Sequence, residues 1–249
     1  MPPYARVLLK LSGESLAGGR GLGIDSNALE RIAKDIVEAS NKGVTFGIVI
    51  GGGNFFRGAS SEGLSIEQPQ ADAIGMLATC MNGVVLAAAL RQAGRTAQVF
   101  SALPIGDMGG SCQPYARGKA LQCLQEEEIA IFVGGTGHPY FTTDTAAALR
   151  AAEMDCNALF KATKVDGVYA ADPKAEAGGG ERFDHISYDE ALARGLRFMD
   201  ATALALARDT GMPILLFSIE EGGNLARVSG GEGVFTRIDS GGKHAKSPD

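Results

Sequence analysis

The chain of 249 residues contains no tryptophan, only three histidines and four cysteines, and no block of basic residues before its last ten positions. The four cysteines form no C-x-x-C pair, so we expect free buried thiols rather than a zinc site. With a formal charge of -6, the chain also lacks the clustered Lys and Arg that binding to a nucleic-acid backbone requires. No apolar run approaches the length of a membrane span, and the N-terminal run is too short for a signal peptide. We therefore predict a cytoplasmic protein, with neither nucleic acid nor a membrane as partner.

Two standard nucleotide-binding signatures are missing as well. Neither G-x-x-x-x-G-K-[ST] nor G-x-G-x-x-G occurs, although glycine accounts for 35 of the 249 residues, about twice the usual share of roughly 7%. The glycines lie at the ends of predicted strands, which excludes a low-complexity or collagen-like chain. A protein of this sequence that handles phosphate would therefore use another architecture.

Apolar runs and helical stripes alternate along the chain. The runs at 6–11 and 44–50 predict buried strands, and the stripe between them predicts a helix that starts after Asp25, so the first fifty residues form a β-α-β unit with a parallel strand pair. The same signals predict helices over about 71–93 and 114–126, after the strand that begins at Ile129, and after the caps Ser187 and Asp200, with further strands at 96–102, 158–162 and 213–219. Strand followed by helix, repeated, predicts an α/β fold: a three-layer αβα sandwich around a central, mainly parallel sheet.

The last third of the sequence changes in character. Residues 165–173 are rich in turn formers, and 178–184 (GGGERFD) have the composition of a flexible connector. We predict one continuous domain with an N-terminal lobe at 1–154 and a C-terminal lobe at 155–239. The polar tail at 240–249 is predicted to be disordered.

Three segments with phosphate-binding chemistry follow predicted strands. KLSGE (10–14) offers a lysine and close backbone N–H groups, and IGGGNFFRGA (50–59) offers three glycines and a guanidinium. The third, IAIFVGGTGHPYFTTDTA (129–146), runs from a strand through glycines and hydroxyls into a helix N-terminus. Each has a plainer explanation: a lysine extending from a strand edge, a flexible loop, or a βα turn with Asp144 as N-cap. Since the carboxyl ends of parallel strands share one edge, the three together favour a single anion site.

Five motifs carry a resemblance to a known family. KLSGE, IGGGNFFRGA, DAIGMLATCMN (72–82), TGHPYFTTD (136–144) and KATKVDGVYAADP (161–173) occur in this order and resemble those of the bacterial-type uridylate (UMP) kinases of the amino acid kinase superfamily, over about residues 5–239. The resemblance implies the amino acid kinase fold and transfer of the γ-phosphoryl group of ATP to UMP, which gives UDP and ADP in pyrimidine nucleotide biosynthesis. It also implies a Mg²⁺ cofactor that is held by the phosphates and not by protein ligands.

The resemblance also implies roles for individual residues. The implied ATP contacts are Lys10, Leu11, Ser12, Gly13, Gly53, Arg57, Thr163, Tyr169 and Asp172. The implied UMP contacts are Gly52, Asp72, Thr136, Gly137, His138, Pro139, Tyr140, Phe141, Thr142 and Thr143. Lys10, Arg57, Asp144 and, as a weaker candidate, Lys161 are the implied catalytic residues. In-line transfer needs positioning and charge neutralisation, so we expect Asp144 to organise lysine and magnesium and not to act as an essential base.

Two departures from the family pattern affect these expectations. His138 stands where the acceptor loop usually carries Asn, which changes shape and adds a group that titrates near neutral pH. The family implies a homohexamer with GTP as activator and UTP as inhibitor. The implied effector residues are Gly21, Leu22, Gly23, Ile24, Asp25 and Arg91. However, Ala87 and Gln98 stand where some relatives carry arginines.

Two other functions stay open at this point. Another amino acid kinase, acting on acetylglutamate, aspartate or carbamate, would share the lysine and triple-glycine loops but not TGHPYFTTD. A non-catalytic nucleotide sensor would keep the pockets and bind a partner, although Lys10, Arg57, Asp72 and Asp144 are all present here.

Overall fold

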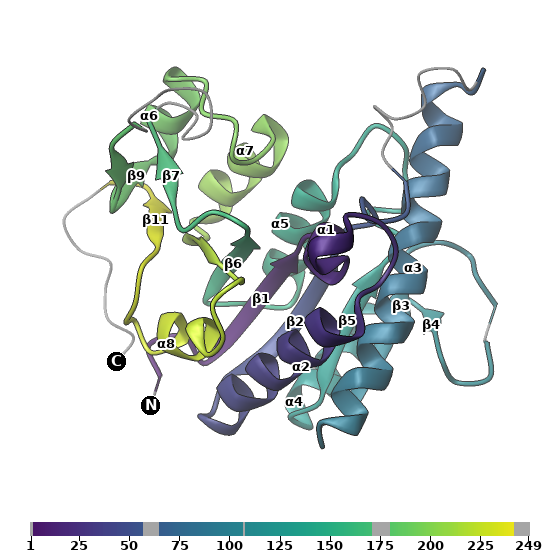
Figure 1. Cartoon of the computed structure of the whole chain (residues 1–249). Helices are drawn as coiled ribbons and strands as arrows, with labels where there is room; N and C mark the ends of the chain where they lie inside the picture. The colour runs from purple at the N-terminus through teal and green to yellow at the C-terminus, as the bar shows by residue number, and fades with distance from the viewer. Residues whose placement is uncertain (1, 57–64, 107, 171–179, 242–249) are drawn as a thin grey trace.

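A single nine-stranded sheet with helices on both faces forms the body of the molecule (Figure 1). The computed structural model describes residues 2–56, 65–106, 108–170 and 180–241. The strand order is β4-β3-β5-β2-β1-β6-β10-β11-β9, and every neighbouring pair is parallel except β10 and β11. The α/β fold with a central, mainly parallel sheet is thereby confirmed.

The strands of this sheet are β1 (Arg6–Leu11), β2 (Thr45–Ile50), β3 (Ala97–Ser101), β4 (Gln113–Pro114), β5 (Ile129–Val133), β6 (Ala158–Thr163), β9 (His185–Ser187), β10 (Ile214–Ser218) and β11 (Thr236–Asp239). A separate antiparallel pair is formed by β7 (Val168–Tyr169) and β8 (Arg182–Phe183). The helices are α1 (Gly13–Leu16), α2 (Ser26–Asn41), α3 (Gln68–Gln92), α4 (Arg117–Gln125), α5 (Thr143–Glu153), α6 (Tyr188–Ala193), α7 (Ala201–Thr210) and α8 (Asn224–Ser229), with a 3₁₀ turn, η1, at Gly18–Arg20.

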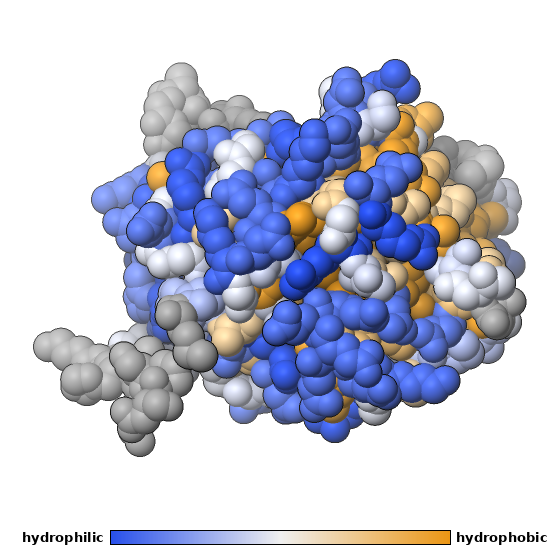
Figure 2. Space-filling view, turned by 90° about the horizontal axis from the view of Figure 1, so that it is seen from below, coloured by the Kyte–Doolittle hydropathy of each residue, from blue (hydrophilic) through white to orange (hydrophobic). Residues whose placement is uncertain are grey.

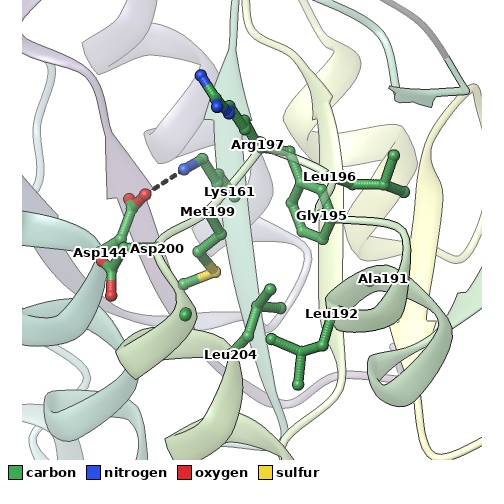
Figure 3. Close-up of a pocket in the computed structure, with 12 residues that line it drawn as sticks. Asp144, Lys161, Ala191, Leu192, Gly195, Leu196, Arg197, Met199, Asp200 and Leu204 are labelled. Carbon is green, nitrogen blue, oxygen red and sulfur yellow. Dashed lines mark hydrogen bonds and ion pairs between the residues drawn. The ribbon is translucent and has the colours of Figure 1, made fainter.

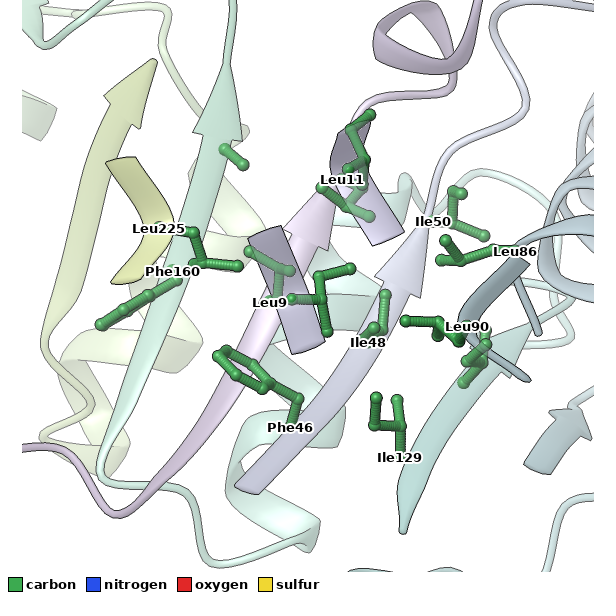
Figure 4. Packing of buried hydrophobic residues seen from close by; sticks show 14 of the residues in the cluster. Leu9, Leu11, Phe46, Ile48, Ile50, Leu86, Leu90, Ile129, Phe160 and Leu225 are labelled. Carbon is green, nitrogen blue, oxygen red and sulfur yellow. The ribbon is translucent and has the colours of Figure 1, made fainter. Parts of the chain in front are cut away.

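Alternation along the strands divides the core into two layers. Leu9 and Leu11 of β1 face α2, α3 and α8, where they join a buried cluster with Ile48 (Figure 4). Leu8, between them, faces the other way and joins the buried side chains of α4, α5, α6 and α7. Because successive side chains of a strand point to opposite faces, a continuous apolar run is what a sheet covered on both sides requires.

Most predicted boundaries agree with the structure, and two predictions were wrong. The helix expected from residue 114 begins at Arg117, because Gln113–Pro114 instead form β4, an edge strand where proline costs no ladder hydrogen bond. Part of the expected flexible connector is ordered: Arg182–Phe183 form β8 and pair with Val168–Tyr169.

Helix α3 differs from expectation in another respect. By length and composition alone α3 could cross a membrane, but a buried core helix of a soluble protein meets the same two criteria. Leu86 and Leu90 are fully buried against the sheet, whereas Ile74, Leu77 and Met81 are exposed. Apolar surface gathers in Figure 2 on the right-hand side, which is the side of α3 in Figure 1. Packing against the sheet therefore explains part of the apolar composition of α3, and the part of the chain that the structure describes leaves Ile74, Leu77 and Met81 exposed.

Gly83 allows α3 to lie close to β5. A Cβ atom at this position would come within 2.3 Å of Val133 Cγ1, while a Cβ at Gly75 of the same helix would meet nothing within 4 Å. We expect Gly83→Ala to lower the free energy of unfolding by about 1 to 3 kcal/mol through overpacking. The matched variant Gly75→Ala is expected to raise it by about 0.5 to 1 kcal/mol through helix propensity. Urea denaturation followed by circular dichroism measures both, and an equal effect of the two variants would contradict the packing assignment.

Candidate functional site

Four adjacent strands deliver the predicted functional residues to one edge of the sheet. In the order β5-β2-β1-β6, the carboxyl ends of these strands lead to the 134–142 loop, the triple-glycine loop, and the segments after Leu11 and Thr163. Lys10 and Lys161 are register partners on the parallel strands β1 and β6, so the two ammonium groups start from neighbouring backbone positions. The convergence expected from the sequence is therefore observed, and it brings two lysines together.

Asp144 lies between these lysines, in the first turn of α5. Its Oδ1 lies 2.9 Å from Lys10 Nζ, and its Oδ2 accepts a hydrogen bond from Lys161 Nζ (Figure 3). The three side chains are only 13%, 9% and 14% exposed for Lys10, Lys161 and Asp144. Thr142, not Asp144, is the N-cap of α5, so the alternative of Asp144 as an ordinary cap was wrong. Asp144 is thereby free to organise the lysines.

The electrostatics of this cluster suit a bound anion. Burial raises the pKa of Asp144, but the charges of Lys10 and Lys161 outweigh it and hold that pKa below its usual value. Burial also lowers the pKa of Lys161, and the carboxylate of Asp144 only partly opposes this effect. The two ammonium groups share the carboxylate of Asp144, and Asp200 is a further anionic neighbour of Lys161. The positive charges of Lys10 and Lys161 in this largely buried place suit an anion such as a phosphoryl group.

Close packing fixes the glycine loops beside this cluster. A Cβ at Gly13 would lie 2.6 Å from Asn54 Oδ1 and 2.7 Å from Gly51 O, and one at Gly52 would lie 2.6 Å from Gly75 O. These glycines are thus required for the approach of the loops to each other and to α3, independently of any ligand. Ser12 accepts a hydrogen bond from Glu14 N and caps α1, while Leu11 is fully buried.

A buried amide pair that the sequence analysis did not identify ties these loops together. Asn54 and Asn82 exchange two hydrogen bonds of 3.0 and 2.7 Å, and both side chains are fully buried. Asn54 also donates to Gly23 O, and Asn82 donates to Gly51 O. Both residues lay inside quoted motifs, but nothing in the sequence alone paired them across 28 positions.

The 134–142 loop is held by its own contacts and by α3. Gly134, Gly135 and Gly137 have positive φ, and so does Tyr140 with a φ of 70°. Gly134 N donates to Thr79 Oγ1, and several further N–H groups of the loop are bonded within the protein. These bonds join Gly137 N to Gly134 O, His138 N to Thr136 Oγ1, and Tyr140 N to Asp72 Oδ2. The exposed members of the loop are His138, Tyr140, Phe141 and Thr142, while Thr136, Gly137, Pro139 and Thr143 are half-buried. Some of the N–H groups expected to bind an anion therefore already have partners.

Asp72 is brought to this loop from α3. Its Oδ2 accepts from Tyr140 N at 2.7 Å, and its Oδ1 accepts from Gln68 Nε2 at 2.8 Å. The carboxylate thus lies at the edge of the loop that the sequence predicted to surround UMP. Two sequence-predicted residues elsewhere in the site, Arg57 and Asp172, lie outside the described residues.

The remaining predicted nucleotide contacts lie beyond β6. Thr163 Oγ1 donates to Val165 O and accepts from Val165 N, which closes a turn at the end of the strand. Tyr169 of β7 donates its hydroxyl to Asp166 Oδ1 at 2.6 Å. Gly53 is half-buried in the loop after β2.

The predicted effector segment is tied to the glycine loop. Gly21 and Gly23 have positive φ, Gly23 N donates to Asn54 O at 2.8 Å, and Asp25 caps α2. Leu22 is 69% exposed, and Ile24 is half-buried. Arg91 is exposed in the last turn of α3. Ala87 is buried, and Gln98 donates a hydrogen bond to Glu128. Neither side chain carries the positive charge that an arginine at these positions would supply.

A cleft of about 590 Å³ opens beside the lysine cluster (Figure 3). Asp144 and Lys161 form one wall, and the segment from Gly195 to Asp200 between α6 and α7 forms much of the rest. Asp200 accepts hydroxyl hydrogen bonds from Thr142 and Thr145 and caps α7. The sequence identified Asp200 only as a helix cap, because its contacts with α5 depend on tertiary packing.

Mg²⁺ was expected to arrive on phosphates. Among the described residues, no group of three or more His, Cys, Asp or Glu side chains could hold a metal ion. Both oxygens of Asp144 face lysines, so the donor set fits a cation that nucleotide phosphates carry.

Comparison with known proteins agrees with this fold. The model of the amino acid kinase family matches residues 5–218. Uridylate kinases from Rhodopseudomonas palustris and Cereibacter sphaeroides are 49% and 47% identical over 95% and 94% of this chain, and 98% and 94% of those proteins are covered. The crystal structure of UMP kinase from Bacillus anthracis superposes with a TM-score of 0.91 at 37% identity, over 96% of this chain and 98% of that one. The chain therefore belongs to the amino acid kinase family and, within it, to the uridylate kinases.

Removal of the carboxylate between the lysines tests the anion site. We expect Asp144→Asn to lower the free energy of unfolding by about 3 kcal/mol, because two partly buried ammonium groups lose their counter-charge. Millimolar phosphate should raise the melting temperature of this variant by more than it raises that of the wild type. Differential scanning fluorimetry with and without phosphate measures this difference, with chloride at equal ionic strength as the control. Equal responses to phosphate and chloride would contradict an anion site at these lysines.

Proposed function

We propose that this chain is a UMP kinase that transfers the γ-phosphoryl group of ATP to UMP and gives UDP and ADP. The observation that carries the proposal is the buried cluster of Lys10, Asp144 and Lys161 at the carboxyl edge of the sheet. Two ammonium groups held by one carboxylate supply fixed positive charge where charge moves between phosphates. The names of the relatives, uridylate kinase and UMP kinase, supply the acceptor.

In the proposed mechanism the protein positions the two nucleotides and neutralises the negative charge of the transferring phosphoryl group. Lys10 and Lys161 donate to oxygens of the transferring group, and Asp144 keeps both side chains in place. Because the pKa of Asp144 is held below its usual value, this residue stays ionised at neutral pH and is suited to organise cations, not to accept the proton of the acceptor. Mg²⁺, held by the nucleotide phosphates and not by protein side chains, would neutralise part of their charge.

Acceptor recognition is assigned to the edge of α3 and the 134–142 loop. Asp72 would accept hydrogen bonds from the two vicinal hydroxyls of the ribose, a pair of donors that matches its two oxygens. In the structure these oxygens accept from Tyr140 N and Gln68 Nε2, which the ribose hydroxyls would replace. His138, an exposed residue of the loop, would meet the base.

The division into lobes follows from these assignments. Residues 1–154 would bind UMP, and residues 155–239, with Thr163, Tyr169 and Asp172, would bind the adenosine part of ATP. Lys10, Leu11, Ser12, Gly13, Gly53 and Arg57 would reach the ATP phosphates from the first lobe. Gly13 and Gly51 bring the backbones of the two loops into close contact, which supports a backbone surface shared by both loops for the phosphates.

Assembly, control and location are part of the same proposal. The exposed apolar residues Ile74, Leu77 and Met81 of α3 support an oligomer, and a homohexamer is the form proposed. GTP as activator and UTP as inhibitor are proposed through Gly21–Asp25 and Arg91, with the bond between Gly23 and Asn54 as the link to the phosphate loop. The proposed setting is pyrimidine nucleotide biosynthesis in the cytoplasm.

Incubation of the purified protein with Mg-ATP and each nucleoside monophosphate tests the function directly. We expect ADP release with UMP to exceed that with CMP, AMP or GMP, because the 134–142 loop is assigned to the base, in which these nucleotides differ. The ribose that Asp72 would bind is common to all four. Acetylglutamate, aspartate and carbamate serve as acceptors in parallel, since they test other amino acid kinase activities. Faster turnover of any of these acceptors, or tight nucleotide binding without turnover, would overturn the proposal.

Loss of the Asp144 carboxylate and loss of the Asp72 carboxylate are expected to affect different kinetic constants. Asp144→Ala should lower kcat by about 100-fold or more with a smaller change in KM for UMP, because it loses charge organisation in the transition state. Asp72→Ala should raise KM for UMP about tenfold or more with a smaller change in kcat, because the ribose hydroxyls lose the charged carboxylate that accepts their hydrogen bonds. Steady-state kinetics with 2′-deoxy-UMP as a further acceptor provides the control, since removal of one hydroxyl should affect Asp72→Ala less than the wild type. The reverse assignment of kcat and KM effects would mean that the two roles are exchanged.

A further inference from the structure

The carboxylate of Asp200 lies where α7 meets α5. Its Oδ1 accepts from Ala203 N at 2.9 Å and so caps α7. The same carboxylate accepts the hydroxyl of Thr145, at 3.0 Å from Oδ1 and 3.3 Å from Oδ2, and the hydroxyl of Thr142 at Oδ2. A helix cap uses one acceptor, so the two threonine contacts are additional to capping.

Thr142 passes this contact on to Asp144. Its Oγ1 accepts from Asp144 N at 3.0 Å and from Thr145 N at 3.3 Å, as the N-cap of α5. A hydroxyl has a single proton, and when that proton is donated to Asp200 the lone pairs of the oxygen remain for the two N–H groups. Asp200 therefore fixes the rotation of the hydroxyl that holds the backbone of Asp144.

Asp200 also belongs to the electrostatic surroundings of Lys161. Asp144 and Asp200 raise the pKa of this lysine, while burial and the charge of Lys10 lower it. These groups come from three different elements, α5, the start of α7 and β1, that pack around β6. Both Asp200 and Lys161 line the cleft of about 590 Å³ (Figure 3).

We infer that Asp200 is a positioning residue for phosphoryl transfer, which locks the Thr142 cap so that Asp144 is held between Lys10 and Lys161. The inference rests on the proposed function for its kinetic consequence, but its structural basis does not. Asp200 acts through Thr142 and Asp144, and it links α7 of the C-terminal lobe to the first turn of α5 in the N-terminal lobe.

Asp200→Asn is the principal test. Asparagine keeps the size of the side chain and an oxygen for the α7 cap, but it loses the negative charge and turns a donor toward the threonine hydroxyls. We expect kcat with UMP to fall about tenfold, because reacting groups lose their alignment, while KM for ATP and for UMP stays within about threefold. The basic limb of the pH profile of kcat should move to lower pH, since Lys161 loses one of its two anionic neighbours.

Two further variants separate positioning from simple destabilisation. Ser187→Ala removes the N-cap of the neighbouring helix α6, where Ser187 Oγ accepts from Glu190 N at 3.1 Å, and should lower the melting temperature while kcat stays unchanged. Thr142→Val combined with Asp200→Asn should lower kcat no further than the more damaging single variant, because both act on one contact. Multiplicative losses in the double variant, or an unshifted pH profile in Asp200→Asn, would overturn the inference.

Hydrogen exchange keeps the inference independent of the assigned substrate. In the ligand-free protein, the amide of Asp144 should exchange faster in Asp200→Asn than in the wild type, while the amide of Ala28, capped by Asp25 in α2, should be unchanged. A wild type that does not phosphorylate UMP but shows this difference would reject the proposed function and leave the positioning role. A wild type that phosphorylates UMP but shows unchanged exchange and kcat in Asp200→Asn would reject the positioning role alone.

Discussion

The constraint on which the site depends is the placement of two lysines opposite each other on adjacent parallel strands. Lys10 and Lys161 are register partners, so their side chains leave the sheet on the same face and meet at low exposure. Two ammonium groups in such a place repel each other and lose hydration, which a folded protein tolerates only with a counter-charge. Asp144 provides it, and α5 must begin where this carboxylate can reach both. The cap at Thr142 and its contact with Asp200 follow from the same requirement.

The parts of the fold that could be predicted are those that depend on local sequence patterns, such as apolar runs, helical periodicity and capping residues. Arg6–Leu11 is a strand with the predicted limits. Helix α2 begins after Asp25, as predicted, and α7 begins after the predicted cap Asp200. Pro114 was misassigned because a proline just before a helical stripe is equally compatible with an edge strand, and only the sheet order decides between them. The pairing of Arg182–Phe183 with β7 was missed for a similar reason, since a two-residue strand has no periodicity to detect.

The types of residue in the site could be predicted from the sequence, but the contacts between these residues could not. A lysine in an apolar strand, a triple glycine and the 129–146 segment pointed to phosphate from residue type alone, and the resemblance added roles for them. The contacts that hold these residues were not predictable: Asn54 with Asn82, Tyr140 with Asp72, and Asp200 with Thr142 join positions 28, 68 and 58 residues apart. Hydrogen-bonding side chains such as Asn and Asp look alike in a sequence whether they cap a helix, face water or bridge two elements.

The continuity of the sheet has a mechanical consequence. β1 belongs to the first predicted lobe and β6 to the second, and the two strands are joined by a parallel ladder over Val7–Leu11. The backbone hydrogen bonds of the ladder consequently fix the distance between the main-chain positions of Lys10 and Lys161, and β1 cannot separate from β6 without breaking them. Any movement that accommodates substrates of different length must therefore occur in the loops at the edge of the sheet, such as the segment around Tyr140. The strands that carry the two lysines keep their positions.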